Sequence, residues 1–241
     1  MGLAMTKQAT AEELVTLVTE MLGRADRYAA IELLGRHDPQ LAAEVYEKLQ
    51  LDLYWKQKNL PATVAFSQAG IQHSLTAAGK ATDDAAARSL RGAAKHLAYN
   101  LASFTWPGWN EPGIVITESD LAIGLEAARL NVRLAEELDR PEKARANALW
   151  TLGAQQLAAG DHSQAAETFG RAQSHAIRAD APALVQMLEG YVLMSHSLAQ
   201  PADGNGRFES FVDSLRADGT QEAKEYAEQL SVAMTVFQKP V

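Results

Sequence analysis

The feature that most constrains this chain is the near absence of strand patterns beside a long series of amphipathic helical segments. Alanine and leucine, both strong helix formers, dominate the sequence. The nearest approach to a run of β-branched residues is residues 114–116, which are too few to anchor a sheet. Apolar residues instead recur at the spacing of helix faces, with turn residues between them. The sequence therefore predicts an all-α fold of about eleven helices.

Local signals predict where several helices begin and end. Thr10 and Glu13 have the spacing of a capping box, which places the start of the first helix. Asp161 is expected to cap a later helix, and Pro182 suits the first turn of the next one. Residues 201–206 combine proline, two polar residues and two glycines, and we expect them to form a flexible link.

Composition argues against several classes of function. The chain has 241 residues, no cysteine and a formal net charge of −8 at pH 7. Without cysteine it has no disulfide, thiol nucleophile or thiolate metal site. The excess of acidic residues disfavours binding to nucleic acid backbones. No apolar run approaches the roughly 18 residues that span a bilayer, and no basic segment followed by an apolar core opens the chain. We therefore expect a cytoplasmic protein that binds neither membranes nor nucleic acid.

No group of residues predicts catalysis or metal binding. The six histidines show neither a His-x-x-x-His pair nor a His-Glu zinc motif, and only His96, beside Lys95, is placed near a possible binding surface. Adjacent acidic residues such as Glu12 and Glu13 point about 100° apart on a helix, so they do not converge on a metal ion. We expect that the protein is not an enzyme and needs no cofactor or metal.

Residues 146–179 carry the most specific pattern in the chain. Small and large apolar residues stand there at fixed spacings, namely Leu149, Trp150, Leu152, Gly153, Ala165, Phe169 and Ala172. This pattern resembles a tetratricopeptide repeat (TPR), a helical hairpin of about 34 residues. Small residues at Gly153 and Ala165 allow the paired helices to approach closely. Two positions depart from the family pattern, because Gln156 replaces an aromatic residue and Ile177 replaces the terminal proline.

Weaker forms of the same pattern occur at residues 43–76, at residues 91–134 and from residue 181 onwards. The resemblance implies that residues 10–241 form a single TPR-like domain after a flexible segment of residues 1–9. In that family, helical hairpins stack into a right-handed superhelix, and here a C-terminal helix would cap the stack. A single hairpin is too thin to bury its own apolar face, so its neighbours must cover it.

The resemblance also implies a concave groove, lined by the first helix of each repeat, in which the family binds extended peptides or helices. The matching groove positions are Glu44, Glu47, Leu51, Tyr54, Trp55, Lys95, Tyr99, Asn147, Trp150 and Ala154. Aromatic rings with carboxylates at one end suit a partner segment with apolar anchors and a basic residue. Alternatively, Trp55 and Trp150 are buried between repeats. Glu47 stands where carboxylate-capturing members of the family need a lysine, so capture of a chaperone's C-terminal carboxylate is not expected.

The loop of residues 106–113 is the most unusual local feature. Trp106 and Trp109 flank a Pro-Gly turn there. They either form a protruding recognition element or fold back onto the helices together with Ile114 and Ile116.

We therefore expect an adaptor that binds a protein or peptide partner in its groove. One alternative is a self-assembling structural module and hence a homo-oligomer, which the apolar face of residues 221–237 would favour. Another is a helical small-molecule sensor or enzyme with an apolar pocket near His96 or Trp106.

Overall fold

The structure is a computed structural model that describes residues 9–24 and 26–238, so all but the last residue of the expected flexible segment 1–9 lies outside the described part. Within these residues all regular structure is helical, which confirms the all-α prediction. None of the described helices is long and apolar enough to cross a lipid bilayer.

The helices are α1 (Ala11–Gly23), α2 (Arg27–Leu34), α3 (Pro39–Leu51), a π-helix η1 (Asp52–Lys56), α4 (Leu60–Lys80), α5 (Asp84–Phe104), a 3-10 helix η2 (Pro107–Trp109), α6 (Glu118–Glu137), α7 (Glu142–Ala158), α8 (His162–Arg178), α9 (Pro182–Ala199), α10 (Pro201–Asp218) and α11 (Gln221–Phe237).

The capping box predicted at the start of α1 is confirmed. The Thr10 backbone N–H donates to Glu13 Oε2 at 2.8 Å, and the Glu13 N–H donates to Thr10 Oγ1 at 3.2 Å. The same reciprocal pair opens α6, where Thr117 and Asp120 cap each other. Both boxes satisfy first-turn N–H groups that have no partner inside the helix.

One expectation about helix ends holds in part and another is wrong. Asp161 occupies the N-cap position of α8, as expected, but its side chain accepts no capping hydrogen bond, and the preceding turn is made by Gly160 with φ of +81°. The expected link at residues 201–206 instead forms the first turns of α10. Glycine inside a helix costs only about 1 kcal/mol. Burial of Phe208 and Val212 further along α10 offsets that cost.

The chain divides into two compact units, residues 1–97 and 98–241, with the division inside α5. In the first unit, α3 packs on both α1 and α4. The rings of Tyr46 and Phe66 lie 6.2 Å apart in this unit's core. A buried polar contact supports the packing, because Gln50 Nε2 donates to Ser67 Oγ at 2.7 Å and to the Leu97 carbonyl at 2.9 Å.

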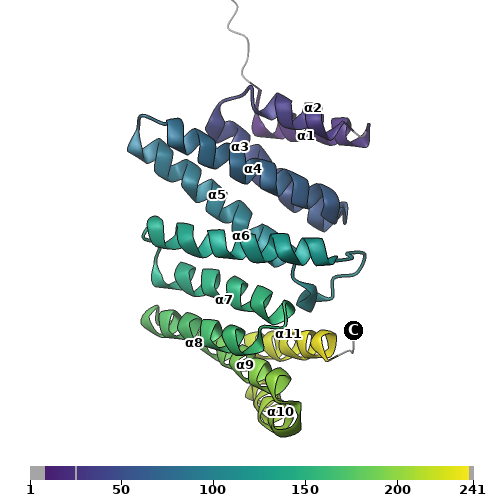
Figure 1. Cartoon of the computed structure of the whole chain (residues 1–241), viewed down its shortest axis with the longest axis vertical. Coiled ribbons are helices and arrows are strands. Elements are labelled where there is room, and N and C mark those ends of the chain that lie inside the picture. Colours follow the sequence, from purple (N-terminus) through teal and green to yellow (C-terminus); the bar gives the residue numbers. More distant parts are fainter. Residues whose placement is uncertain (1–8, 25, 239–241) are drawn as a thin grey trace, which may run out of the picture. The chain divides into compact units, whose positions relative to one another are not determined.

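In the second unit the helices α6, α7, α8 and α9 pack in chain order, and Figure 1 shows α6, α7 and α8 lying side by side. The close approach predicted for residues 146–179 is present. A Cβ atom on Gly153 would lie only 2.7 Å from the Phe169 ring, and Ala165 and Ala172 are fully buried. The small residues therefore permit α7 and α8 to pack in contact.

The last helix of this unit, α11, packs against three elements, namely α9, α10 and η2. On the α9 side, Leu230 covers Gly190 so closely that a Cβ atom there would lie 2.3 Å from the leucine methyl. On the η2 side, the Phe237 ring lies 6.1 Å from that of Trp106. This placement brings α11 beside α7 and α9 around a common pocket.

Candidate functional site

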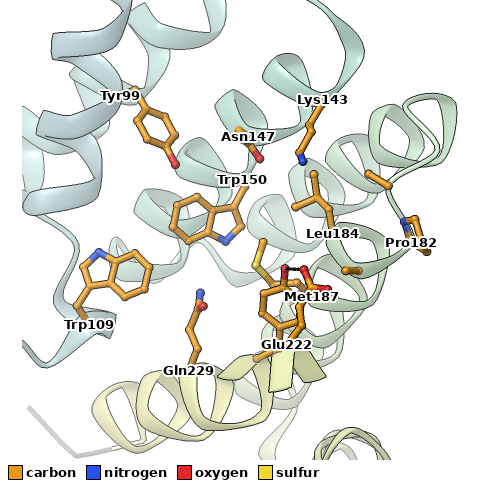
Figure 2. A pocket seen from close by; sticks show the side chains of 13 residues that line it. Tyr99, Trp109, Lys143, Asn147, Trp150, Pro182, Leu184, Met187, Glu222 and Gln229 are labelled. Carbon is orange, nitrogen blue, oxygen red and sulfur yellow. Dashed lines mark hydrogen bonds between the residues drawn. The ribbon is translucent and has the colours of Figure 1, made fainter. Parts of the chain in front are cut away.

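A pocket of about 470 Å³ opens on the second unit, with side chains from α5, η2, α7, α9 and α11 around it (Figure 2). The residues that line it are Tyr99, Trp109, Lys143, Asn147, Trp150, Ala181, Pro182, Ala183, Leu184, Met187, Glu222, Tyr226 and Gln229. Four of these are aromatic, and Leu184 and Met187 add aliphatic surface. Its size and its mainly apolar lining are typical of sites that bind small molecules or anchor side chains.

The pocket brings together four residues that the sequence pattern singles out. Tyr99, Asn147 and Trp150 come from the predicted groove positions, and Trp109 comes from the unusual loop. Asn147 and Trp150 share one face of α7 with Lys143, since residues spaced by three or four lie on the same side of a helix.

The two tryptophans form one wall of the pocket. Their rings lie 5.7 Å apart at 51°, and Trp109 is held in place because its Nε1–H donates to the Ser103 carbonyl at 2.9 Å. Trp150 is only 5% exposed and also packs 6.1 Å from the Tyr191 ring. The expected burial of Trp150 is therefore present, and part of its ring also lines the pocket.

The tyrosines around the pocket remain neutral at physiological pH. Burial is the main cause that raises the pKa of Tyr226, to about 12, and the neighbouring Glu222 carboxylate adds to it. Burial also raises the pKa of Tyr99 and Tyr191. The Tyr226 hydroxyl therefore keeps its proton and donates to Glu222 Oε1 at 3.2 Å.

Of the remaining predicted groove residues, Ala154 is buried in α7 of the second unit, and the others lie in the first unit. Tyr54 is buried and Trp55 is 51% exposed, so burial between repeats is wrong for Trp55. Lys58 Nζ sits 5.2 Å from the Trp55 ring centre, which is a cation–π contact. Sequence reasoning did not predict the π-helix η1, and this irregular turn carries both aromatic residues.

The charged groove candidates of the first unit differ in exposure. Lys95 is buried, whereas Glu44 is exposed and pairs with Lys48 at 3.1 Å. Glu47 is partly buried, and this burial, with the nearby Glu44 charge, raises the pKa of its carboxyl. His96 Nδ1 lies 3.7 Å from Glu47 on the surface. These contacts describe a solvated polar face of α3 and α5.

The loop of residues 106–113 does not protrude at its first tryptophan. Trp106 is 1% exposed and its ring packs 5.0 Å from Trp109 and 6.0 Å from Tyr191. The inward-packing alternative is therefore confirmed for Trp106, because burying the ring avoids a large exposed apolar surface. Ile114 and Ile116 are partly buried, in line with the same alternative.

Sequence reasoning missed the contributions of α9 and α11 to the pocket. Glu222, Tyr226 and Gln229 have the spacing of one helix face, and that periodicity is the signal that marks them as a unit. Which neighbour this face meets depends on where α11 docks, and no local pattern encodes that position.

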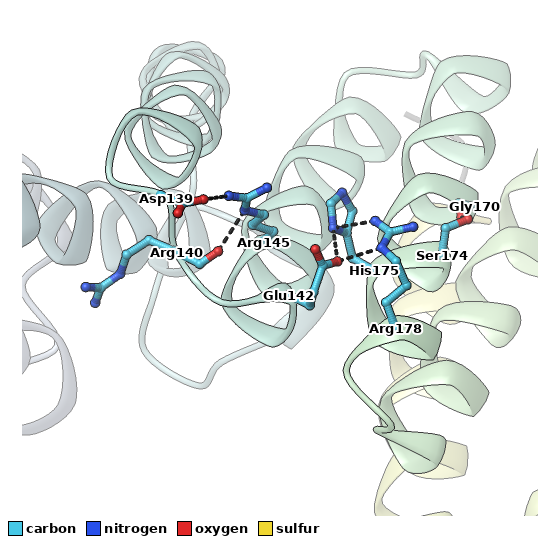
Figure 3. Close-up of polar contacts among 8 residues, drawn as sticks. All are labelled: Asp139, Arg140, Glu142, Arg145, Gly170, Ser174, His175 and Arg178. Atoms are coloured by element: carbon cyan, nitrogen blue, oxygen red, sulfur yellow. Dashed lines mark hydrogen bonds and ion pairs between the residues drawn. The ribbon is translucent and has the colours of Figure 1, made fainter.

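A second polar cluster joins the start of α7 to the end of α8 (Figure 3). Glu142 Oε2 lies 2.7 Å from His175 Nδ1 and accepts from Arg178 Nε at 2.8 Å. The His175 contact is the larger cause, and Arg178 the smaller, of a lowered pKa for the Glu142 carboxyl. Among the residues that the structure describes, no group of three or more histidine or acidic side chains is arranged to hold a metal ion. The cluster thus ties the hairpin together.

A scan against protein-family models gives no match for this chain, and a search of curated proteins gives none either. The resemblance of residues 146–179 to a TPR therefore rests on its residues and their packing.

Proposed function

We propose that this protein is a TPR-like adaptor that binds a segment of a partner protein, with a large apolar side chain of that segment seated in the pocket of the second unit. The observation that carries the proposal is the origin of the pocket walls. Besides η2, the pocket is lined by α5, α7, α9 and α11, which are alternate helices of the chain. In the TPR family, which the sequence resembles, the first helix of each successive hairpin lines the groove in the same alternating way.

The chemistry of the pocket suits an anchor residue. Trp109 and Trp150 present rigid aromatic surface, and Met187 adds an adaptable apolar side chain. Burying a leucine or phenylalanine side chain there contributes about 1.5–3 kcal/mol. Micromolar affinity needs about 8 kcal/mol, so the segment must also make contacts outside the pocket. Exposed groups at its edge, including Lys143 and Glu222, are placed to make them.

The proposal is tested by selecting peptides that bind the full-length protein and then measuring how tightly they bind a variant whose pocket is filled. Ala183→Trp places a bulky ring at the pocket wall, whereas Glu189→Trp adds the same ring to an exposed position of α9 that does not line the pocket. We expect selected peptides to contain an aromatic or large aliphatic residue. Their affinity, measured by titration calorimetry, should fall at least tenfold in Ala183→Trp and stay unchanged in Glu189→Trp. Equal binding by both variants would refute the pocket as the anchor site.

The volume of the pocket also favours a second candidate, a site for a small apolar molecule, because about 300–1,000 Å³ is the usual range for such sites. A screen of aromatic fragments by thermal unfolding distinguishes the two. A fragment of low molecular weight that binds at micromolar concentration, while no selected peptide binds, would favour a sensor over an adaptor.

A further inference from the structure

One wall of the pocket carries hydrogen-bond donors without acceptors. Lys143 and Asn147 lie one turn apart on α7, and neither side chain has a hydrogen-bond or ion-pair partner among the described residues. In Figure 2 the side chains drawn around the pocket share a single hydrogen bond, the one between Tyr226 and Glu222. An ammonium group and an amide therefore face the opening with their donors unused.

Deeper in the same wall, Trp150 supplies aromatic surface. Its side chain is 5% exposed, and its Nε1 atom has almost no accessible surface. Burial raises the pKa of the neighbouring Tyr191 hydroxyl, and hydrogen bonds from Gln229 Nε2, at 2.6 Å, and from Trp150 partly offset that rise. Figure 2 shows the nitrogen edge of Trp150 turned toward Met187, inside the pocket.

The first turn of α9 adds backbone donors to this wall. Ala181, Pro182, Ala183 and Leu184 all line the pocket, and no side chain caps the helix at Ala181. The N–H groups of Ala183 and Leu184 have no partner within the helix, and the positive end of the helix dipole lies there. Together with Lys143, this helix end favours a negatively charged group.

The opposite wall has the reverse character. Glu222 on α11 carries a negative charge, and its neighbour Tyr226 already donates to it. An anionic group entering the pocket is therefore attracted to α7 and the start of α9 and repelled by α11. We infer that the partner segment carries an aspartate or glutamate next to its apolar anchor, and that this carboxylate pairs with Lys143 and the start of α9. This inference rests on the proposed function, because it names the chemistry of the segment.

Three probes that share one phenyl ring and differ in charge test the inference. They are N-acetylphenylalanine, its neutral amide, and phenylalaninamide, which carries a positive charge. Saturation-transfer NMR with the full chain measures the dissociation constant of each. We expect the anionic probe to bind about threefold to fivefold more tightly than the neutral amide, which is the range for an exposed ion pair, and the cationic probe to bind most weakly. Added salt should reduce these differences.

Matched variants show whether the charge preference comes from Lys143 on α7 or from Glu222 on α11. Lys143→Gln alters an exposed side chain and should bring the affinities for the anionic probe and for the neutral amide to the same value. Glu222→Gln should raise the affinity for the anionic probe and lower it for the cationic one. Ala183→Trp should weaken all three.

The outcomes separate the two proposals. If no phenyl probe binds, or if Ala183→Trp leaves binding unchanged, the pocket does not take an apolar anchor and the proposed function fails with the inference. If the probes bind in the pocket without a charge preference, or if the cation binds best, the inference fails and the proposed function stands.

Discussion

At the scale of single residues, two glycines of the α7–α8 hairpin have opposite roles. Gly153 faces the Phe169 ring, and a Cβ atom there would lie 2.7 Å from it. Gly170, in the middle of α8, has no atom within 4 Å of such a Cβ. The first glycine is required for close packing, whereas the second only adds conformational freedom to the unfolded chain.

We therefore expect Gly153→Ala to lower the free energy of unfolding by about 1–3 kcal/mol, since the methyl group overpacks the helix contact. Gly170→Ala, its control, should raise that free energy by about 0.5–1 kcal/mol. Urea denaturation followed by circular dichroism measures both. If both substitutions raised the free energy of unfolding equally, α7 and α8 would not be in contact at Gly153.

The Glu142 cluster predicts how stability depends on pH. Because His175, and then Arg178, lowers the pKa of the Glu142 carboxyl below 4.5, the ionised form is favoured in the folded state. Its stabilising effect is present above pH 4.5 and is lost as the pH falls through the folded-state pKa. We expect Glu142→Gln to lower the melting temperature at pH 7 and to have a smaller effect at pH 3.

The control for this change is Glu189→Gln, which alters an exposed glutamate for which the structure shows no ion pair among the described residues. It should leave the melting temperature unchanged at both pH values. A Glu142→Gln effect that is the same at pH 3 and pH 7 would contradict the predicted linkage.

At the scale of helices, the docking of α11 decides whether the pocket has the wall that Glu222, Tyr226 and Gln229 form. Leu230 is fully buried against Gly190 of α9, and Tyr226, one turn away, faces the pocket. The apolar face of α11, which motivated the self-assembly alternative, is thus covered within the same unit by α9, α10 and η2.

We predict that Leu230→Ala lowers the free energy of unfolding by about 2–5 kcal/mol, because it leaves a cavity between α9 and α11. Val115→Ala, at a position that is 80% exposed, should change it by less than about 0.5 kcal/mol. Denaturant titration compares the two. A small effect of Leu230→Ala would mean that α11 is not held at this contact, and the pocket would lose its α11 wall.

At the scale of the whole molecule, each unit has a core of its own. Phe66 lies in the core of the first unit and Phe169 in that of the second, and both are fully buried. In helical-repeat proteins, stability is approximately the sum of local contributions and contacts between neighbours, so damage to one core is expected to act first on its own unit.

Hydrogen exchange tests this expectation. Phe66→Ala should speed amide exchange mainly in α3 and α4, and Phe169→Ala mainly in α7, α8 and α9, each variant costing about 3–5 kcal/mol locally. Exchange that accelerates equally throughout the chain in both variants would instead support the single cooperative domain that the sequence pattern predicts.

The sequence by itself determined the helices and part of the pocket. Helical periodicity and local caps such as Thr10 depend on residues within one turn of each other, so they can be read without a fold. The same holds for Asn147 and Trp150, whose spacing by itself places them on one face of α7.

Only the tertiary structure decided which surfaces meet. Trp106 turned inward and Trp109 joined the pocket because η2 packs against α11 and α7, elements distant from it in sequence. The donors of α9 and the carboxylate of Glu222 face one another for the same reason. Burial of apolar area is non-directional, so a helix face encodes that it must be covered but not which neighbour covers it.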